Sequence, residues 1–114
     1  MSTVYKILGR AEWDAAVAAG AFTGSDIDRR DGYIHLSGAD TAQETARLYF
    51  SGRDDLVLAA VPAAALGSAL KWEASRGGTL FPHLYGVLDV TLVGEVRAVA
   101  PDVDGTPQLG SLRP

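Results

Sequence analysis

Hydrophobic residues recur along the chain in runs that predict alternating strands and helices. Residues 4–8 are β-branched and aromatic enough for an N-terminal strand. Across residues 10–19, apolar side chains fall at helical spacing and Gly20 stands at the expected C-terminal cap, which predicts a short amphipathic helix. Residues 56–61 are apolar without alternation and end at Pro62, the pattern of a strand covered on both faces. We therefore place this last strand centrally in a sheet.

The remaining segments are less regular. Residues 21–32 are rich in Asp and Gly and carry no sustained period, which predicts a long loop with room for one helical turn. Asp40 to Gln43 resembles a capping box and predicts the start of a helix that ends near Ser51. A helical turn is predicted at residues 63–66, and further strands at residues 69–74, 81–85 and 87–99.

Strands interrupted by two helices, with the later strands consecutive, predict an α+β fold. We expect one small domain over residues 1–99, built on a mixed, mostly antiparallel split sheet with two helices. A chain of 114 residues buries roughly two-thirds of its unfolded surface, enough for one core. Residues 100–114 offer little to bury and predict an extended or flexible C-terminal tail.

Composition narrows the possible functions. The formal charge of −4, without a block of basic residues, argues against nucleic-acid binding through bulk electrostatics. With no cysteine, the chain has no disulfide, no thiolate nucleophile and no cysteine-bound zinc. It shows neither a signal peptide pattern nor a stretch of about 20 apolar residues, so we expect a soluble cytoplasmic protein with no membrane partner.

Common catalytic fingerprints are also absent from the sequence. It contains no P-loop, no Gly-x-Gly-x-x-Gly, no His-Glu-x-x-His and no Gly-x-Ser-x-Gly. A nucleophilic triad built on Ser37 is disfavoured, because His35 lies only two residues away on the same predicted strand.

The two histidines lie in the segments richest in polar residues next to aromatic ones. Histidine serves as acid, base or metal ligand near neutral pH. In the first segment, residues 31–37, strand alternation places Ile34 and Leu36 towards the core. Tyr33, His35 and Ser37 then share the opposite face.

The same alternation sorts residues 71–86. It places Leu70 and Trp72 inward and puts Lys71, Glu73 and Ser75 on the other face, while Phe81, His83 and Tyr85 share one face of the next strand. If these strands are neighbours, one cleft collects two imidazoles, a carboxylate, a lysine and several aromatic rings. Structural roles are the alternatives: packed histidines, a surface pair of Glu73 with Lys71 or Arg76, and a simple hairpin turn at residues 76–79.

Three motifs carry a family resemblance: Asp-Gly-Tyr-Ile-His-Leu-Ser, Lys-Trp-Glu-Ala-Ser-Arg-Gly-Gly and Leu-Phe-Pro-His-Leu-Tyr-Gly. With them the chain resembles the bacterial family named domain of unknown function 952. That resemblance implies a relation to the ADP-ribosyltransferase-like fold, in which an early strand carries a His or Arg and a later strand a Glu. His35 and Glu73 match those two positions.

The resemblance implies an enzyme that uses NAD as substrate or binds another nucleotide ligand containing ADP-ribose. Glu73 would stabilise an oxocarbenium-like state, as carboxylates do in glycoside hydrolysis. His35, with Ser37 beside it, would bind a ribose hydroxyl. The other implied contacts are stacking of nicotinamide on Tyr49, Phe81 or Tyr85 and neutralisation of the pyrophosphate by Lys71 or Arg76.

Other activities stay open on the sequence. The segment Ile-His-Leu-Ser also resembles RNA 2′-phosphotransferases of the same fold, in which case Arg76 and His83 would be the working pair in phosphoryl transfer. A metal site could form from His35, His83 and a carboxylate, either Glu73 or Asp31. A third alternative is a module that binds a ligand or partner protein without catalysis.

Overall fold

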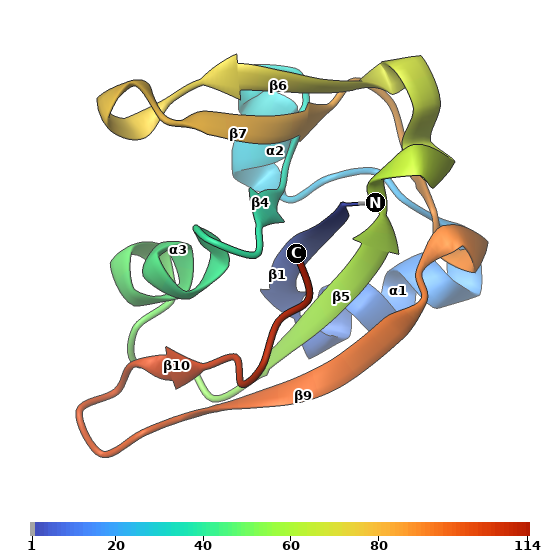
Figure 1. Ribbon diagram of the computed structural model, residues 1–114. Helices are drawn as coiled ribbons and strands as arrows, with labels where there is room; N and C mark the ends of the chain where they lie inside the picture. The colour runs from blue at the N-terminus through green and yellow to red at the C-terminus, as the bar shows by residue number, and fades with distance from the viewer. Residues whose placement is uncertain (1) are drawn as a thin grey trace.

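Five antiparallel strands form the main sheet of the computed structural model, which describes residues 2–114. In order across the sheet they are β10 (Pro107–Gln108), β9 (Glu95–Pro101), β5 (Leu56–Pro62), β1 (Thr3–Gly9) and β4 (Ser37–Gly38). The central position of β5 confirms the prediction from its unbroken apolar run, since both of its faces are covered. Figure 1 shows β1, β5 and β9 side by side, with β6 and β7 above them.

Two smaller sheets complete the fold. One has the order β3 (Ile34–His35), β7 (Leu80–Leu84), β6 (Leu70–Ala74), and the other pairs β2 (Ala21–Phe22) with β8 (Leu88–Asp89). The chain passes from the three-stranded sheet to the main sheet at Leu36, whose N–H donates to the Pro82 carbonyl at 3.0 Å. The predicted α+β fold with a split sheet is confirmed, but the predicted mixed sheet is wrong, because every pairing within residues 2–114 is antiparallel.

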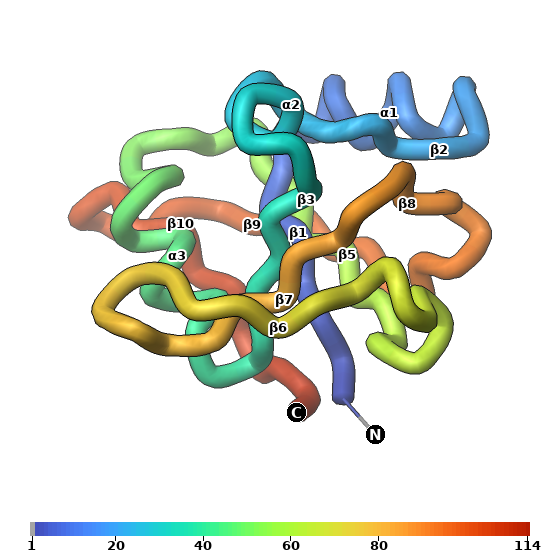
Figure 2. Tube along the Cα trace, turned by 90° about the horizontal axis from the view of Figure 1, so that it is seen from above, coloured from blue at the N-terminus to red at the C-terminus, as the bar shows by residue number. Residues whose placement is uncertain are grey.

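The structure has more helices than the two predicted. The α-helices are α1 (Arg10–Ala19), α2 (Asp26–Asp31) and α3 (Ala42–Tyr49), and the 3₁₀ segments are η1 (Ala63–Ala69), η2 (Arg76–Gly78) and η3 (Val90–Leu92). The predicted loop over residues 21–32, with its one helical turn, is more regular than expected, because it contains β2 and the six-residue helix α2. Ser25 caps this helix and its N–H donates to Asp28 Oδ2 at 2.9 Å, which stabilises the first turn. Figure 2 shows α1 and α2 on the same side of the molecule.

Two local predictions fail because tertiary partners take over the polar groups. The capping box at Asp40 does not form: Thr41 is the N-cap of α3 and makes no side-chain cap. The Gln43 amide instead donates to the Pro107 carbonyl and accepts from the Leu109 N–H. The predicted strand over residues 87–99 is interrupted by η3, because the Asp89 carboxylate caps that turn.

The core lies on both faces of the main sheet, since neighbouring residues of each strand point to opposite sides. On one face, Val4, Leu8 and Val57 pack with Ile34 and Leu84 of the three-stranded sheet. On the other face, a second cluster contains Tyr5, Ile7, Leu58, Ala42 and Ala46. The smaller sheet is therefore anchored by its apolar face, and its other face carries the polar side chains.

The C-terminal segment contributes to the second cluster. Leu109 is buried, and β10 pairs with β9. The Tyr5 hydroxyl donates to the Arg113 carbonyl at 2.8 Å and accepts from the Arg113 N–H at 2.7 Å. The Thr3 N–H donates to the Pro114 carbonyl, which holds this segment beside β1. Within residues 2–114, no helix is long and apolar enough to cross a membrane.

Candidate functional site

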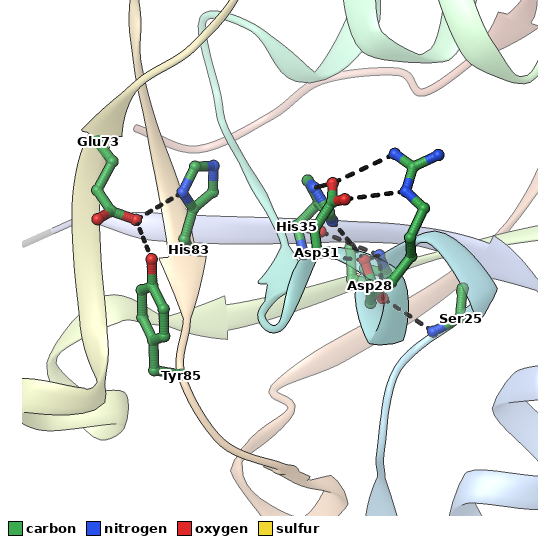
Figure 3. Close-up of polar contacts among 9 residues, drawn as sticks. Ser25, Asp28, Asp31, His35, Glu73, His83 and Tyr85 are labelled. Carbon is green, nitrogen blue, oxygen red and sulfur yellow. Dashed lines mark hydrogen bonds and ion pairs between the residues drawn. The ribbon is translucent and has the colours of Figure 1, made fainter.

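The three-stranded sheet brings both histidines and Glu73 to one face. His35 pairs with His83 across β3 and β7, and His83 pairs with Lys71 across β7 and β6. Glu73 lies two residues along β6 from Lys71, so its side chain lies on the same face. The adjacency on which the sequence prediction depended is therefore present, and Figure 3 shows His83 between Glu73 and His35.

Glu73, His83 and Tyr85 form a hydrogen-bonded group. His83 Nδ1 lies 2.8 Å from Glu73 Oε1, and the Tyr85 hydroxyl donates to the same oxygen at 2.7 Å (Figure 3). The hydrogen bonds from Tyr85 and His83 lower the pKa of Glu73, and the bond to Glu73 raises the pKa of Tyr85. Glu73 is thus held as a carboxylate that orients the imidazole.

The other nitrogen of His83 is available for chemistry. Its Nε2 makes no hydrogen bond within residues 2–114. In the same residues, every fully buried side-chain nitrogen or oxygen has a hydrogen-bond partner, so Nε2 is not fully buried. Nε2 therefore keeps some contact with solvent, although the His83 side chain is only 5% exposed. A histidine oriented through Nδ1 with Nε2 accessible has the arrangement of a general base.

Aromatic rings surround His83. The Tyr33 ring stacks on the His83 ring with centroids 4.1 Å apart and an interplanar angle of 28°. Tyr33 also lies 4.6 Å from His35 and 5.3 Å from Tyr85, measured between ring centroids. Tyr33 is half-buried and Tyr85 exposed, so these rings form a platform at the surface. We call Tyr33, His35, Glu73, His83 and Tyr85 the ring cluster.

His35 is bound at both ring nitrogens by carboxylates of α2. Its Nδ1 lies 2.7 Å from Asp28 Oδ1, and its Nε2 lies 3.0 Å from Asp31 Oδ2. A carboxylate only accepts hydrogen bonds, so both contacts are hydrogen bonds only when both ring nitrogens carry protons. His35 therefore fixes α2 against β3, and neither nitrogen is open to a ligand.

Asp28 also accepts from a buried lysine. Lys6 Nζ lies 3.0 Å from Asp28 Oδ2 and donates to the His35 carbonyl at 3.0 Å. The side chains of Lys6 and Asp28 are only 7% and 1% exposed. Burial alone would raise the pKa of Asp28, but the Lys6 charge and the hydrogen bonds from Ser25 and His35 outweigh it and lower the pKa.

The sequence prediction missed both Lys6 and Asp28, although one signal for Lys6 was present. In the first strand, alternation places Lys6 on the same face as Val4 and Leu8, which are core residues. A lysine on a buried face needs a carboxylate partner. No pattern in residues 21–32 distinguishes Asp28 from the other Asp residues of that segment as the partner.

The lowered pKa of Asp28 predicts a loss of stability in acid. The folded-state pKa lies below the unfolded value of about 3.9, so the unfolded chain binds this proton more readily. The stabilisation is present above that value and is lost as the pH falls through the folded-state pKa. Urea unfolding between pH 6 and pH 2 should show this loss. Below pH 4, the free energy of unfolding of Asp28→Asn should change with pH along a shallower slope than that of the wild type. Equal slopes for the two proteins would contradict the prediction.

Several predicted site residues lie outside the ring cluster. Ser37 is buried, pairs with Tyr5 in the main sheet and donates to Thr45 Oγ1, because the chain changes sheets at Leu36. Arg76 stacks on Phe81, at 4.5 Å from the ring centroid, and also donates to Thr45 Oγ1. Ser37 does not share a face with Tyr33 and His35, and Arg76 and Phe81 pack together towards α3.

Two aromatic residues are more exposed than predicted. Trp72 points inward as predicted, with its ring over buried Gly38 of β4, but it is 43% exposed because β6 lies at the edge of its sheet. Tyr49 is exposed on α3, where Arg76 lies 5.7 Å from its ring centroid. Lys71, in contrast, lies in register with His83 and is exposed, as the predicted cleft required.

Neither a metal-ligand group nor a deep pocket marks the ring cluster. Within residues 2–114, no group of three or more His, Cys, Asp or Glu side chains could hold a metal ion. A hollow of about 330 Å³ lies between α3 and the β6–β7 hairpin, lined by Glu44, Leu48, Arg76 and Phe81 among others. A ligand at the ring cluster would lie on an open platform.

Comparison with known proteins identifies the family. The model of the family described as "Protein of unknown function (DUF952)" matches residues 7–96. The chain belongs to the DUF952 family. This result confirms the family resemblance of the three motifs, all of which lie inside the matched range.

Solved structures from the same comparison agree with this assignment. A crystal structure of protein CC0527 from Caulobacter crescentus is 57% identical, with a TM-score of 0.93 and 95% of each chain covered. A solution NMR structure of CC0527 is also 57% identical, with a TM-score of 0.86 and coverage of 95% of this chain and 93% of that one. No curated protein matches the DUF952 chain.

Proposed function

We propose that this DUF952 protein binds NAD or a related ligand containing ADP-ribose on the ring cluster, and transfers the ADP-ribosyl group to water or another hydroxyl. The observation that carries the proposal is the 2.8 Å contact between Glu73 and His83, which leaves Nε2 of His83 accessible beside two tyrosine rings. The proposed relation to the ADP-ribosyltransferase-like fold rests on the His35 and Glu73 positions and is part of this proposal.

Ligand binding is supported by the rings and charges at the platform. Tyr33 and Tyr85 offer aromatic surface for the planar nicotinamide or adenine ring. Lys71, exposed and in register with His83, supplies a positive charge for the pyrophosphate. We assign His35 to holding the platform in place through Asp28 and Asp31, since both of its nitrogens are bound.

In the proposed reaction, His83 acts as general base. Its Nε2 takes the proton of the attacking hydroxyl while the oxygen forms a bond to the anomeric carbon of the ribose. The bond from that carbon to the nicotinamide nitrogen breaks, and nicotinamide leaves as a neutral molecule with the electron pair. Glu73 orients His83 and offsets the positive charge that develops on the imidazole and on the ribose.

A thermal-shift titration with NAD, ADP-ribose and nicotinamide tests binding. A ligand at a hundredfold excess over its Kd should stabilise the protein by about 2.7 kcal/mol. Tyr33→Ala should weaken this effect, whereas Tyr49→Ala, which changes an exposed tyrosine of α3, should leave it intact. The absence of a shift with all three ligands would overturn the proposal.

Release of nicotinamide from NAD tests catalysis separately. Binding with no release, and no ADP-ribosylated product with an added hydroxyl acceptor, would leave a ligand-binding module and overturn the proposed transfer step. Binding with release, both lost in Tyr33→Ala, would support the full proposal.

A further inference from the structure

Strand β6 leaves one edge of the three-stranded sheet open. Its only strand partner within residues 2–114 is β7, and Figure 1 shows it along the outer margin of the molecule. Trp72 and Leu80, on β6 and β7, are exposed apolar side chains near this edge. An open edge with exposed apolar residues is a template for pairing with another strand.

The hydrogen bonds around β7 decide which backbone groups of β6 face outward. The Pro82 carbonyl accepts from Leu36, so Pro82 faces β3, and Phe81 and His83 therefore face β6. Their partners across the pair are Glu73 and Lys71. The backbone groups of Leu70, Trp72 and Ala74 must then point away from β7.

Most of these outward groups are available. The Leu70 N–H donates to the Gly67 carbonyl, which removes one donor from the edge. The Leu70 carbonyl, both backbone groups of Trp72 and the Ala74 N–H remain to form a ladder with a second strand.

The sequence of β6 is complementary to itself in antiparallel pairing. When Trp72 is placed opposite Trp72 of a second copy, Lys71 falls opposite Glu73 and Leu70 opposite Ala74. Each charge then faces an opposite charge, and the apolar residues face one another. The same register joins the outward groups: the two Trp72 residues exchange N–H and carbonyl, and each Ala74 N–H meets a Leu70 carbonyl.

Glu73 and Lys71 each have capacity for such a contact. The hydrogen bonds to Glu73 use only Oε1, and Lys71 makes no ion pair within residues 2–114. Across the interface, Lys71 and Glu73 of the second copy would be opposite each other without sharing backbone hydrogen bonds. Such non-hydrogen-bonded pairs bring side chains closest together. The Lys71 of the second copy would reach the free oxygen of Glu73.

We propose that β6 is a homodimer interface, in which two copies of the chain pair antiparallel about Trp72 and join their three-stranded sheets into one. The contact places a lysine of each copy beside the Glu73 of the other, at the margin of the ring cluster. The interface shares Lys71 and Glu73 with the proposed site, but the oligomeric state that tests it does not depend on the proposed function.

Sedimentation velocity at several protein concentrations tests the dimer. Wild type should approach twice the 11.9 kDa of one chain as concentration rises. Lys71→Glu sets like charges opposite each other at both symmetric contacts and should raise the dimer Kd about tenfold or more. Arg10→Glu makes the same charge change at an exposed residue of α1 and should leave the Kd unchanged.

Two further variants keep the test decisive. Lys71→Glu combined with Glu73→Lys restores opposite charges and should recover dimerisation relative to Lys71→Glu alone. Ala74→Pro removes an outward N–H that β7 does not use, so it should weaken the dimer while the monomer stays folded by circular dichroism. A wild-type protein that stays monomeric at all concentrations, or a dimer unaffected by both Lys71→Glu and Ala74→Pro, would overturn the proposal.

Discussion

Replacing Asp28 by alanine is expected to lower the free energy of unfolding by about 3–5 kcal/mol, the usual cost of removing one partner of a buried ion pair. Lys6, which is 7% exposed on its side chain, would lose the carboxylate that pairs with it in the core. The backbone N–H groups of Ser25 and His35 would lose their acceptor as well. Because domains of this kind are stable by about 5–15 kcal/mol, the loss is a large fraction of the total. Urea unfolding at pH 7 measures it.

Two controls separate the buried charge from other effects. Asp55→Ala breaks an exposed ion pair with Arg53 and should change stability little. Lys6→Met combined with Asp28→Ala removes both charges and should be less destabilised than the sum of the single variants. If Asp28→Ala is no more destabilised than Asp55→Ala, the Lys6–Asp28 pair does not stabilise the fold as inferred.

Replacing His83 by glutamine is expected to lower kcat for nicotinamide release from NAD about 10²- to 10⁴-fold, the usual contribution of a general base. Glutamine retains hydrogen-bonding groups but cannot take up the proton of the attacking hydroxyl. Steady-state kinetics of the wild type and variant, at saturating NAD, provide the measurement. Wild-type turnover in His83→Gln would rule out His83 as the base.

Glu73→Gln tests the positioning role of the carboxylate. The change keeps an acceptor for the Tyr85 hydroxyl but removes the negative charge beside His83. We expect kcat to fall, with KM nearly unchanged, because the imidazole loses the carboxylate that orients it and offsets the charge developing in the reaction. A fall in kcat accompanied by a large rise in KM would indicate a structural role only.

Much of the scaffold could be predicted from local pattern. The strand at β1, the helix α1 with its cap at Gly20, and the central β5 all follow from apolar spacing and from glycine and proline signals. Helix α2 could be predicted only as one unplaced helical turn, because its six residues are too few to show a helical period. The capping box at Asp40 was wrong because Gln43 bonds to the C-terminal segment, a partner distant in sequence.

The candidate site, like the scaffold, could be predicted only in part. Strand alternation placed His35, Glu73 and His83 on exposed or polar faces, and the sheet register brought those faces together. Alternation failed for Ser37, since the chain leaves one sheet for another at Leu36. For Trp72 alternation gave the correct face, but not its 43% exposure, since a strand at a sheet edge lacks the neighbour that would cover it.

The sequence by itself determined the family and the residue types available for chemistry: two histidines, a nearby glutamate and no cysteine. It also determined which side chains share a face, because strand geometry is local and repeats every two residues. Only the tertiary structure decided that Glu73 orients His83, that Asp28 and Asp31 occupy both nitrogens of His35, and that Lys6 is buried against Asp28. These contacts join residues far apart in sequence, so strand pairing and core packing select them.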